Sequence, residues 1–285
     1  SVEYLSSLGS RVTGHDGAAQ AADWIEAQLQ AMDLAPVHRE TFPVTVPVEI
    51  GGRSRLQIVD TGENIDVYGL WPNGPRTTTI TPEGMEAPLT WVGAGEYADF
   101  DGLPLDGRVV LMEFNTWDHW VRLAALGARA VIFVEPEETA YPQTYDKHLY
   151  VPVDVPRFWV RSQDGARLRR RLQDGAEIDI RLHSRMDWVS RPSWNIWVEI
   201  PGADSALAEE RIVVQSYFDG TSIVPSLAPS AEVSSSAAAL LELGHHLRQQ
   251  RPERTVLLLF SGAHFQAQLG IVDFLNRHAR KSKYY

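Results

Sequence analysis

The segment RTVLLLFSG, residues 254–262, constrains the fold most, because it is a continuous apolar run of strand length. A run of this kind, without alternation between apolar and polar residues, is typical of a strand buried on both faces. Two strand-like segments precede it, residues 195–202 and 211–219, and helical segments at 234–250 and 267–280 follow the second and third strands. This β-β-α-β-α order predicts an α/β domain with a mainly parallel sheet flanked by helices.

The N-terminal part of the chain contributes a helix and a strand to the same domain. Within residues 15–34, the apolar side chains Ala22, Ile25 and Leu29 recur at helical spacing and therefore share one face. Residues 35–50 form an extended stretch interrupted by prolines, and this is typical of a strand at the edge of a sheet. We therefore expect the α/β domain to begin in the first helix.

The middle of the chain has a different character. Between about residues 50 and 185, short strand-like segments alternate with Gly, Pro, Asn and Asp, and few helical segments separate them. This composition predicts a β-rich domain inserted into the α/β domain. We place the discontinuous α/β domain at residues 1–48 and 186–285, incomplete at its C-terminus, and the insertion at residues 49–185.

Composition excludes several classes of function. The chain has 285 residues, 44% of them hydrophobic, with a formal net charge of −11 and no cysteine. The negative charge argues against binding nucleic acid or an anionic membrane, and the lack of cysteine excludes thiol catalysis and disulfides. We find no apolar run of transmembrane length. Both ends resemble cuts in a longer chain, so we favour an extracellular, periplasmic or membrane-anchored fragment over a cytoplasmic protein, although the sequence leaves the compartment open.

Three segments resemble one family in their order and spacing. Residues 9–34, 195–220 and 234–262 resemble the zinc-dependent aminopeptidases related to aminopeptidase S, glutamate carboxypeptidase and the transferrin receptor. The insertion is similar to a protease-associated domain, on the segments GLPLDGRVVLMEF, LAALGARAVIFVEP and VPRFWVRSQDGARLRRRL. The resemblance covers nearly the whole chain and implies a zinc-aminopeptidase-like fold with a protease-associated insertion.

The resemblance also implies where a peptidase site would lie. Such peptidases hold two zinc ions that activate a bridging water, and a free carboxylate takes the proton of that water. In this sequence the first zinc-ligand His falls on Tyr217, the following Asp is kept as Asp219, and the bridging Asp falls on or near Glu232. The Glu-Glu pair that supplies the general base and a ligand falls on Ala263 and His264. A phenol with a pKa near 10 is a poor zinc ligand, and an alanine takes no proton.

These substitutions imply a catalytically degenerate site. We expect a polypeptide-binding or scaffolding module that uses the old cleft or the insertion, with no cofactor. The alternative is an active zinc metallo-aminopeptidase whose site is completed by residues outside this chain. A single-metal site from Asp219, Glu232 and His264 is a further reading, and the loop FNTWDHW, residues 114–120, suggests an interaction surface. The sequence does not indicate the oligomeric state.

Overall fold

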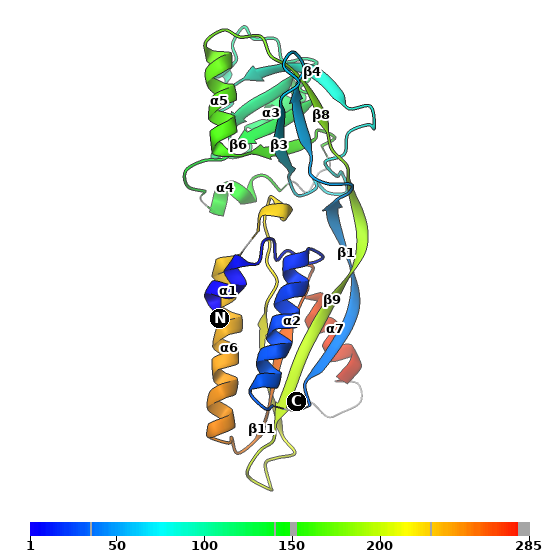
Figure 1. The fold of residues 1–285 in the computed structure, drawn as a ribbon, viewed down its shortest axis with the longest axis vertical. Helices are drawn as coiled ribbons and strands as arrows, with labels where there is room; N and C mark the ends of the chain where they lie inside the picture. The colour runs from blue at the N-terminus through cyan, green and yellow to red at the C-terminus, as the bar shows by residue number, and fades with distance from the viewer. Residues whose placement is uncertain (35, 140, 149–152, 229, 279–285) are drawn as a thin grey trace. The chain divides into compact units, whose positions relative to one another are not determined.

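The computed structural model describes the chain except for residues 35, 140, 149–152, 229 and 279–285 (Figure 1). The side chains of Tyr141, Ala231 and Glu232 also lie outside the described part. The chain divides into two compact units. Unit 1 comprises Ser1–Val46, Val189–Ser222 and Ser226–Tyr285, and unit 2 comprises Pro47–Trp188 together with Ile223–Pro225. No helix within the described residues is long and apolar enough to cross a membrane.

Unit 1 is built on a four-stranded sheet with the order β1-β9-β11-β10, in which β1 and β10 form the edges. Two of its strands, β1 and β9, continue into unit 2. The elements are α1 (Val2–Ser7), α2 (Asp16–Ala31), β1 (His38–Glu49), β9 (Met186–Ile200), β10 (Arg211–Tyr217), α6 (Ala231–Gln249), β11 (Thr255–Ser261) and α7 (Leu269–His278), with a short 3-10 helix, η2 (Pro225–Leu227), before α6.

Helices cover both faces of this sheet. On one face, Leu258 and Phe260 of β11 pack in a cluster with α1, α2 and α6, to which α2 contributes Ile25 and Leu29. On the other face, Leu257 and Leu259 of β11 pack against Phe274 of α7. All seven residues of β11 are buried, as the apolar run predicts. The predicted edge position of the extended N-terminal stretch is confirmed, since β1 has only β9 as a neighbour in the sheet.

The sheet is mixed rather than mainly parallel, and this corrects the expectation from the sequence. Strand β11 is parallel to β10 but antiparallel to β9, with Leu258 opposite Val198. The apolar run indicates that β11 is buried on both faces, and burial carries no information about the direction of neighbouring strands. Strand β9 also begins at Met186, well before the expected start at residue 195, and runs through Pro192 without a break.

Unit 2 contains a closed barrel with the strand order β2-β3-β7-β6-β5-β4-β8. Its core includes Leu56, Ile132 and Ile180, each at most 1% exposed. The elements are β2 (Arg55–Ile58), β3 (Asn64–Gly69), β4 (Met85–Trp91), η1 (Tyr97–Asp99), β5 (Val109–Glu113), α3 (Trp120–Ala125), β6 (Ala130–Val134), α4 (Tyr141–Tyr145), β7 (Arg157–Val160), α5 (Ser162–Gln173) and β8 (Asp179–His183). Each unit therefore has a hydrophobic core of its own.

Candidate functional site

The candidate site lies where β10 and β11 end. The two strands are parallel and in register up to Tyr217 and Ser261. Because parallel strands end at the same edge of a sheet, the residues that follow them meet there, and in open α/β sheets ligands bind at this edge. The structure thus brings together Tyr217, Asp219, Ala263 and His264, as the resemblance implies.

Asp219 is buried and joins two chain segments through hydrogen bonds. Its side chain is 1% exposed. Its Oδ2 accepts a hydrogen bond from Oγ1 of Thr13 at 2.5 Å and one from the backbone N–H of His264 at 3.1 Å. Burial raises the pKa of Asp219 to about 6, although the hydrogen bonds that it accepts oppose this shift. The carboxylate therefore connects the N-terminal loop to the loop after β11.

Tyr217, His264 and Phe265 form an aromatic cluster beside Asp219. The rings of Tyr217 and His264 stack, with centroids 3.8 Å apart and planes 7° from parallel. Phe265 lies edge-on to both rings and is 39% exposed. Burial lowers the pKa of His264, so its imidazole is neutral at pH 7, and its buried Nδ1 has no hydrogen-bond partner among the described residues. The cluster presents neutral aromatic surface at the edge of the sheet.

Ala263 occupies a fixed position in the turn between β11 and α7. It is fully buried and has a positive φ of 53°. Its carbonyl accepts hydrogen bonds from the backbone N–H groups of Gln266 at 3.3 Å and Leu269 at 3.1 Å. Its side chain is a methyl group without a proton acceptor, so this position contributes backbone geometry and no acid–base chemistry.

Thr13 and Arg11 belong to the site and were missed from the sequence. The hydroxyl of Thr13 has a single proton, and it donates this proton to the Asp219 carboxylate. The side-chain amide of Gln266 lies 2.9 Å from the same hydroxyl, and it is best oriented with its nitrogen toward Thr13, so that it can donate. Arg11 is fully buried, and Nη2 donates a hydrogen bond to the carbonyl oxygen of Ser230 at 2.5 Å. Burial lowers the pKa of Arg11 to about 10, and Asp219 opposes this shift.

The backbone of the N-terminal loop is joined to the same region. Val12 and Gly220 form an isolated parallel bridge, in which the N–H of Gly220 donates to the carbonyl of Arg11 at 2.8 Å. A Cβ atom on Gly220 would lie 1.9 Å from Oγ of Ser230, so only glycine fits there. In the sequence, the only pointer to these contacts was the short segment RVT, residues 11–13, after the first helix. Such a short segment cannot identify partners about 200 residues away.

The described residues do not assemble a metal site. No group of three or more His, Asp or Glu side chains within the described part is placed to hold a metal ion. The oxygen Oδ2 of Asp219 already accepts two hydrogen bonds from the protein, and the ring of His264 is stacked on Tyr217. Glu232 lies in the first turn of α6, and its side chain lies outside the described part, so its predicted role as a ligand stays a prediction.

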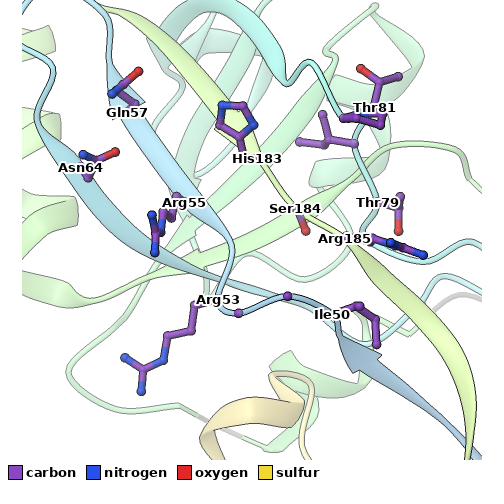
Figure 2. Close-up of a pocket in the computed structure, with 14 residues that line it drawn as sticks. Ile50, Arg53, Arg55, Gln57, Asn64, Thr79, Thr81, His183, Ser184 and Arg185 are labelled. Carbon is purple, nitrogen blue, oxygen red and sulfur yellow. The ribbon is translucent and has the colours of Figure 1, made fainter.

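A second candidate site is a pocket of about 740 Å³ on unit 2 (Figure 2). It is formed by the turn after β1, the outer face of β2, the residues between β8 and β9, and the loop 79–82. Its charged lining residues are Arg53, Arg55 and Arg185, with His183 beside them, and none of its lining residues is acidic. This pocket was not predicted from the sequence, because its residues come from four separate segments.

Comparisons with known proteins identify the fold. No protein-family model matches the sequence, and no curated protein is significantly similar to it. The zinc aminopeptidase BSAP from Bacillus subtilis is similar in structure, with a TM-score of 0.66 and 20% identity over 96% of this chain and 63% of that chain. A peptidase M28 precursor from Shewanella amazonensis SB2B gives a TM-score of 0.59 and 19% identity over 100% of this chain and 68% of that one.

An aminopeptidase from Aneurinibacillus sp. strain AM-1 is also similar, with a TM-score of 0.50 and 20% identity over 97% of this chain and 64% of that chain. The chain thus spans less than two thirds of the length of two of these three aminopeptidases and peptidases. At such low identity the likeness shows the fold alone. These three structural neighbours are a zinc aminopeptidase, an aminopeptidase and a peptidase precursor, and the chain has a peptidase-like α/β fold.

Proposed function

We propose that this chain is a catalytically degenerate, zinc-aminopeptidase-like module that binds a polypeptide or acts as a scaffold. The observation that carries the proposal is that residue 263 is an alanine, whose side chain cannot accept a proton. The family resemblance places the proton acceptor of the peptidase at this position, and here a buried methyl group lies in a tight turn. A general base needs an ionisable group within hydrogen-bond reach of the attacking water. Position 263 offers none.

The stacked pair of Tyr217 and His264 supports the same proposal. The resemblance places a zinc-ligand His at position 217, where a phenol now lies flat against the imidazole of His264 at 3.8 Å. Stacked neutral rings with an edge-on Phe265 suit contact with apolar side chains or peptide groups better than metal ligation. The aromatic cluster of Tyr217, His264 and Phe265 would then serve as a surface that recognises a polypeptide.

We also propose that unit 2 corresponds to a protease-associated insertion. The segments that carry this resemblance coincide with β5, with α3 and β6, and with β7 and α5. They contribute several core residues of the barrel, among them Leu111, Ile132 and Leu168. In this proposal the insertion provides a second surface for binding a polypeptide.

The second candidate function is an active zinc aminopeptidase whose site is completed by residues outside this chain. It is favoured by two solved structures with the same fold, a zinc aminopeptidase and an aminopeptidase, and by the chain spanning 63% of the length of the first and 64% of the second. A ligand set and a base from another part of a longer protein would have to replace the functions absent at Tyr217 and Ala263.

Metal content and turnover separate the two candidates. The full-length protein would be purified without chelator, dialysed against zinc and analysed for bound metal, alongside hydrolysis of a panel of aminoacyl reporter substrates. We expect less than one tightly bound zinc per chain and no turnover. Two zinc ions per chain, with hydrolysis that a chelator abolishes, would overturn the proposal in favour of the active enzyme.

A further inference from the structure

The pocket on unit 2 has a basic lining in an acidic protein. The protein carries a formal net charge of −11, yet four basic residues and no acidic residue line this pocket. The four are Arg53, Arg55, His183 and Arg185. The local sign of charge is therefore opposite to that of the whole molecule.

Strand pairing places two of these four residues in a cross-strand pair, and the other two lie just beyond the ends of the same strands. Arg55 of β2 lies directly opposite His183 of β8. Next to this pair, Oγ of Ser54 and Oγ of Ser184 lie 2.8 Å apart, and both serines are buried. The residues on either side of the two buried serines are exposed. Arg53 and Arg185 therefore flank the pair of Arg55 and His183.

The acidic residues nearby neutralise this block only in part. The carboxylate of Glu49 accepts hydrogen bonds from the hydroxyl and the backbone N–H of Ser54 and forms no ion pair with the arginines among the described residues. Arg53 pairs with Asp66 at 3.3 Å, and Arg185 pairs with Asp187 at 3.0 Å. Both pairs are exposed, and such surface pairs contribute only about 0–1 kcal/mol. Arg55 has no ion pair among the described residues. Since three arginines that line one pocket repel one another, an anionic ligand would stabilise this arrangement.

The directions of the side chains indicate the kind of anion. In Figure 2, Arg185 lies on one side of Ser184, and Arg53 and Arg55 lie on the other, so the three guanidinium groups point in different directions and do not converge on one point. A single small ion cannot contact all three groups. A chain of several carboxylates can, and bidentate contacts between guanidinium and carboxylate are the strongest of this type.

The pocket also has room and polar groups for a peptide backbone. Gly51 and Gly52 in the turn after β1 have positive φ values of 80° and 112°, and a Cβ on either would meet no atom within 4 Å. The turn is therefore open to close approach by another chain. Gln57 and Asn64 line the pocket and supply side-chain amides.

We propose that this arginine pocket (Arg53, Arg55, His183 and Arg185) binds an acidic segment of a partner polypeptide. The inference deepens the proposed function, because it names the chemistry of the polypeptide and the surface of unit 2 that holds it. The negative charge elsewhere on the protein would repel an acidic partner and so restrict its binding to this pocket.

Binding of designed peptides tests the proposal on the full chain. The probe is a fluorescein-labelled eight-residue peptide with four glutamates, and its reference is the analogue with four glutamines; fluorescence anisotropy gives the dissociation constants at low and high salt. We expect the acidic peptide to bind at least tenfold more tightly than its analogue and to weaken as salt rises. Arg55→Gln and Arg185→Gln should each weaken its binding by about tenfold, the effect of one lost charge-assisted contact.

The matched control is Arg170→Gln, which removes the same charge from an exposed position on α5 of the same unit and should leave binding unchanged. Because Arg55 and Arg185 are also exposed, thermal unfolding should show that all three variants fold. Equal binding of the two peptides, or equal affinities for Arg55→Gln and Arg170→Gln, would overturn the proposal. Saturable binding of inorganic phosphate without binding of the acidic peptide would also overturn it, in favour of a small-anion site.

The result is independent of the zinc and turnover assays. A protein that hydrolyses aminoacyl reporters but binds the acidic peptide through Arg55 keeps this inference and loses the proposed function. A protein without zinc or turnover that also fails to distinguish the two peptides loses only this inference.

Discussion

At the scale of the residue, Asp219 shows how one side chain can be retained for a structural reason. Its contacts to Thr13 and to the backbone of His264 hold two loops at the edge of the sheet. The meeting of Asp219 and His264 could be predicted from the sequence, because both follow parallel neighbouring strands. The contact with Thr13 could not, because the two residues are 206 positions apart and no pattern in a short polar loop identifies a distant partner.

The raised pKa of Asp219 predicts a pH dependence of stability. The pKa is about 6 in the folded protein, against an ordinary value of 3.8 for an aspartate. Between these values the folded state holds the proton more tightly than the unfolded state, so the free energy of unfolding falls as pH rises from about 4 to about 6. About two pKa units correspond to a loss of about 3 kcal/mol.

The variant Asp219→Asn cannot titrate and isolates this contribution. Urea unfolding of the wild type and of the variant at pH 4, 5, 6 and 7 gives two curves, and their difference removes the effect of all other carboxylates. We expect this difference to change across the interval and to level off above it. A difference that stays constant with pH would show that Asp219 does not carry the effect.

At the scale of the element, the apolar patterns predicted positions better than directions or ends. The face of α2 and the burial of β11 followed from the spacing of apolar residues. The direction of β9 relative to β11 did not follow from this spacing, because a buried apolar strand has the same pattern whether its neighbour is parallel or antiparallel. Helix α6 also begins at Ala231, before the expected start at residue 234. Ser234 is buried and donates to the carbonyl of Ser230 at 3.3 Å.

The end of α2 offers a direct test of a local rule. Asp33 follows the last residues of the helix with a positive φ of 57°, a conformation that favours glycine after a helix. We expect Asp33→Gly to raise the free energy of unfolding by about 0.5–1 kcal/mol. The substitution also removes the exposed ion pair with Arg248 at 3.2 Å, so Arg248→Ala is the control. Chemical denaturation that shows Asp33→Gly no more stable than Arg248→Ala would contradict this reasoning.

At the scale of the whole molecule, the chain forms two units, each with its own core. The core of unit 1 is shared by the sheet and the helices α1, α2 and α6, and the core of unit 2 lies inside the barrel. The change in composition near residue 50 indicated a second domain, because short strands separated by turn residues favour a barrel or a sandwich. The closure of the barrel depends on pairing between β2 and β8, more than 100 residues apart, and this pairing is not visible in local sequence.

Separate cores predict separate responses to substitution. Ile132 lies in the core of unit 2 and Leu258 in that of unit 1, and both are fully buried. Truncation of either side chain to alanine should cost about 2–5 kcal/mol in its own unit. In differential scanning calorimetry we expect two transitions, with Ile132→Ala lowering one and Leu258→Ala lowering the other. Equal shifts of a single transition by both variants would show that the chain unfolds as one cooperative body.

The role of Asp219 bears on how related sequences are read. Any relative that keeps the link between its N-terminal loop and the turn after β11 would be under selection to keep this carboxylate, whether or not it hydrolyses peptides. Under the proposed function, an aspartate at this position is poor evidence of enzymatic activity, because its role is to join two loops. The positions that would distinguish a working peptidase are then 217 and 263, where the scaffold requires neither an imidazole nor a carboxylate.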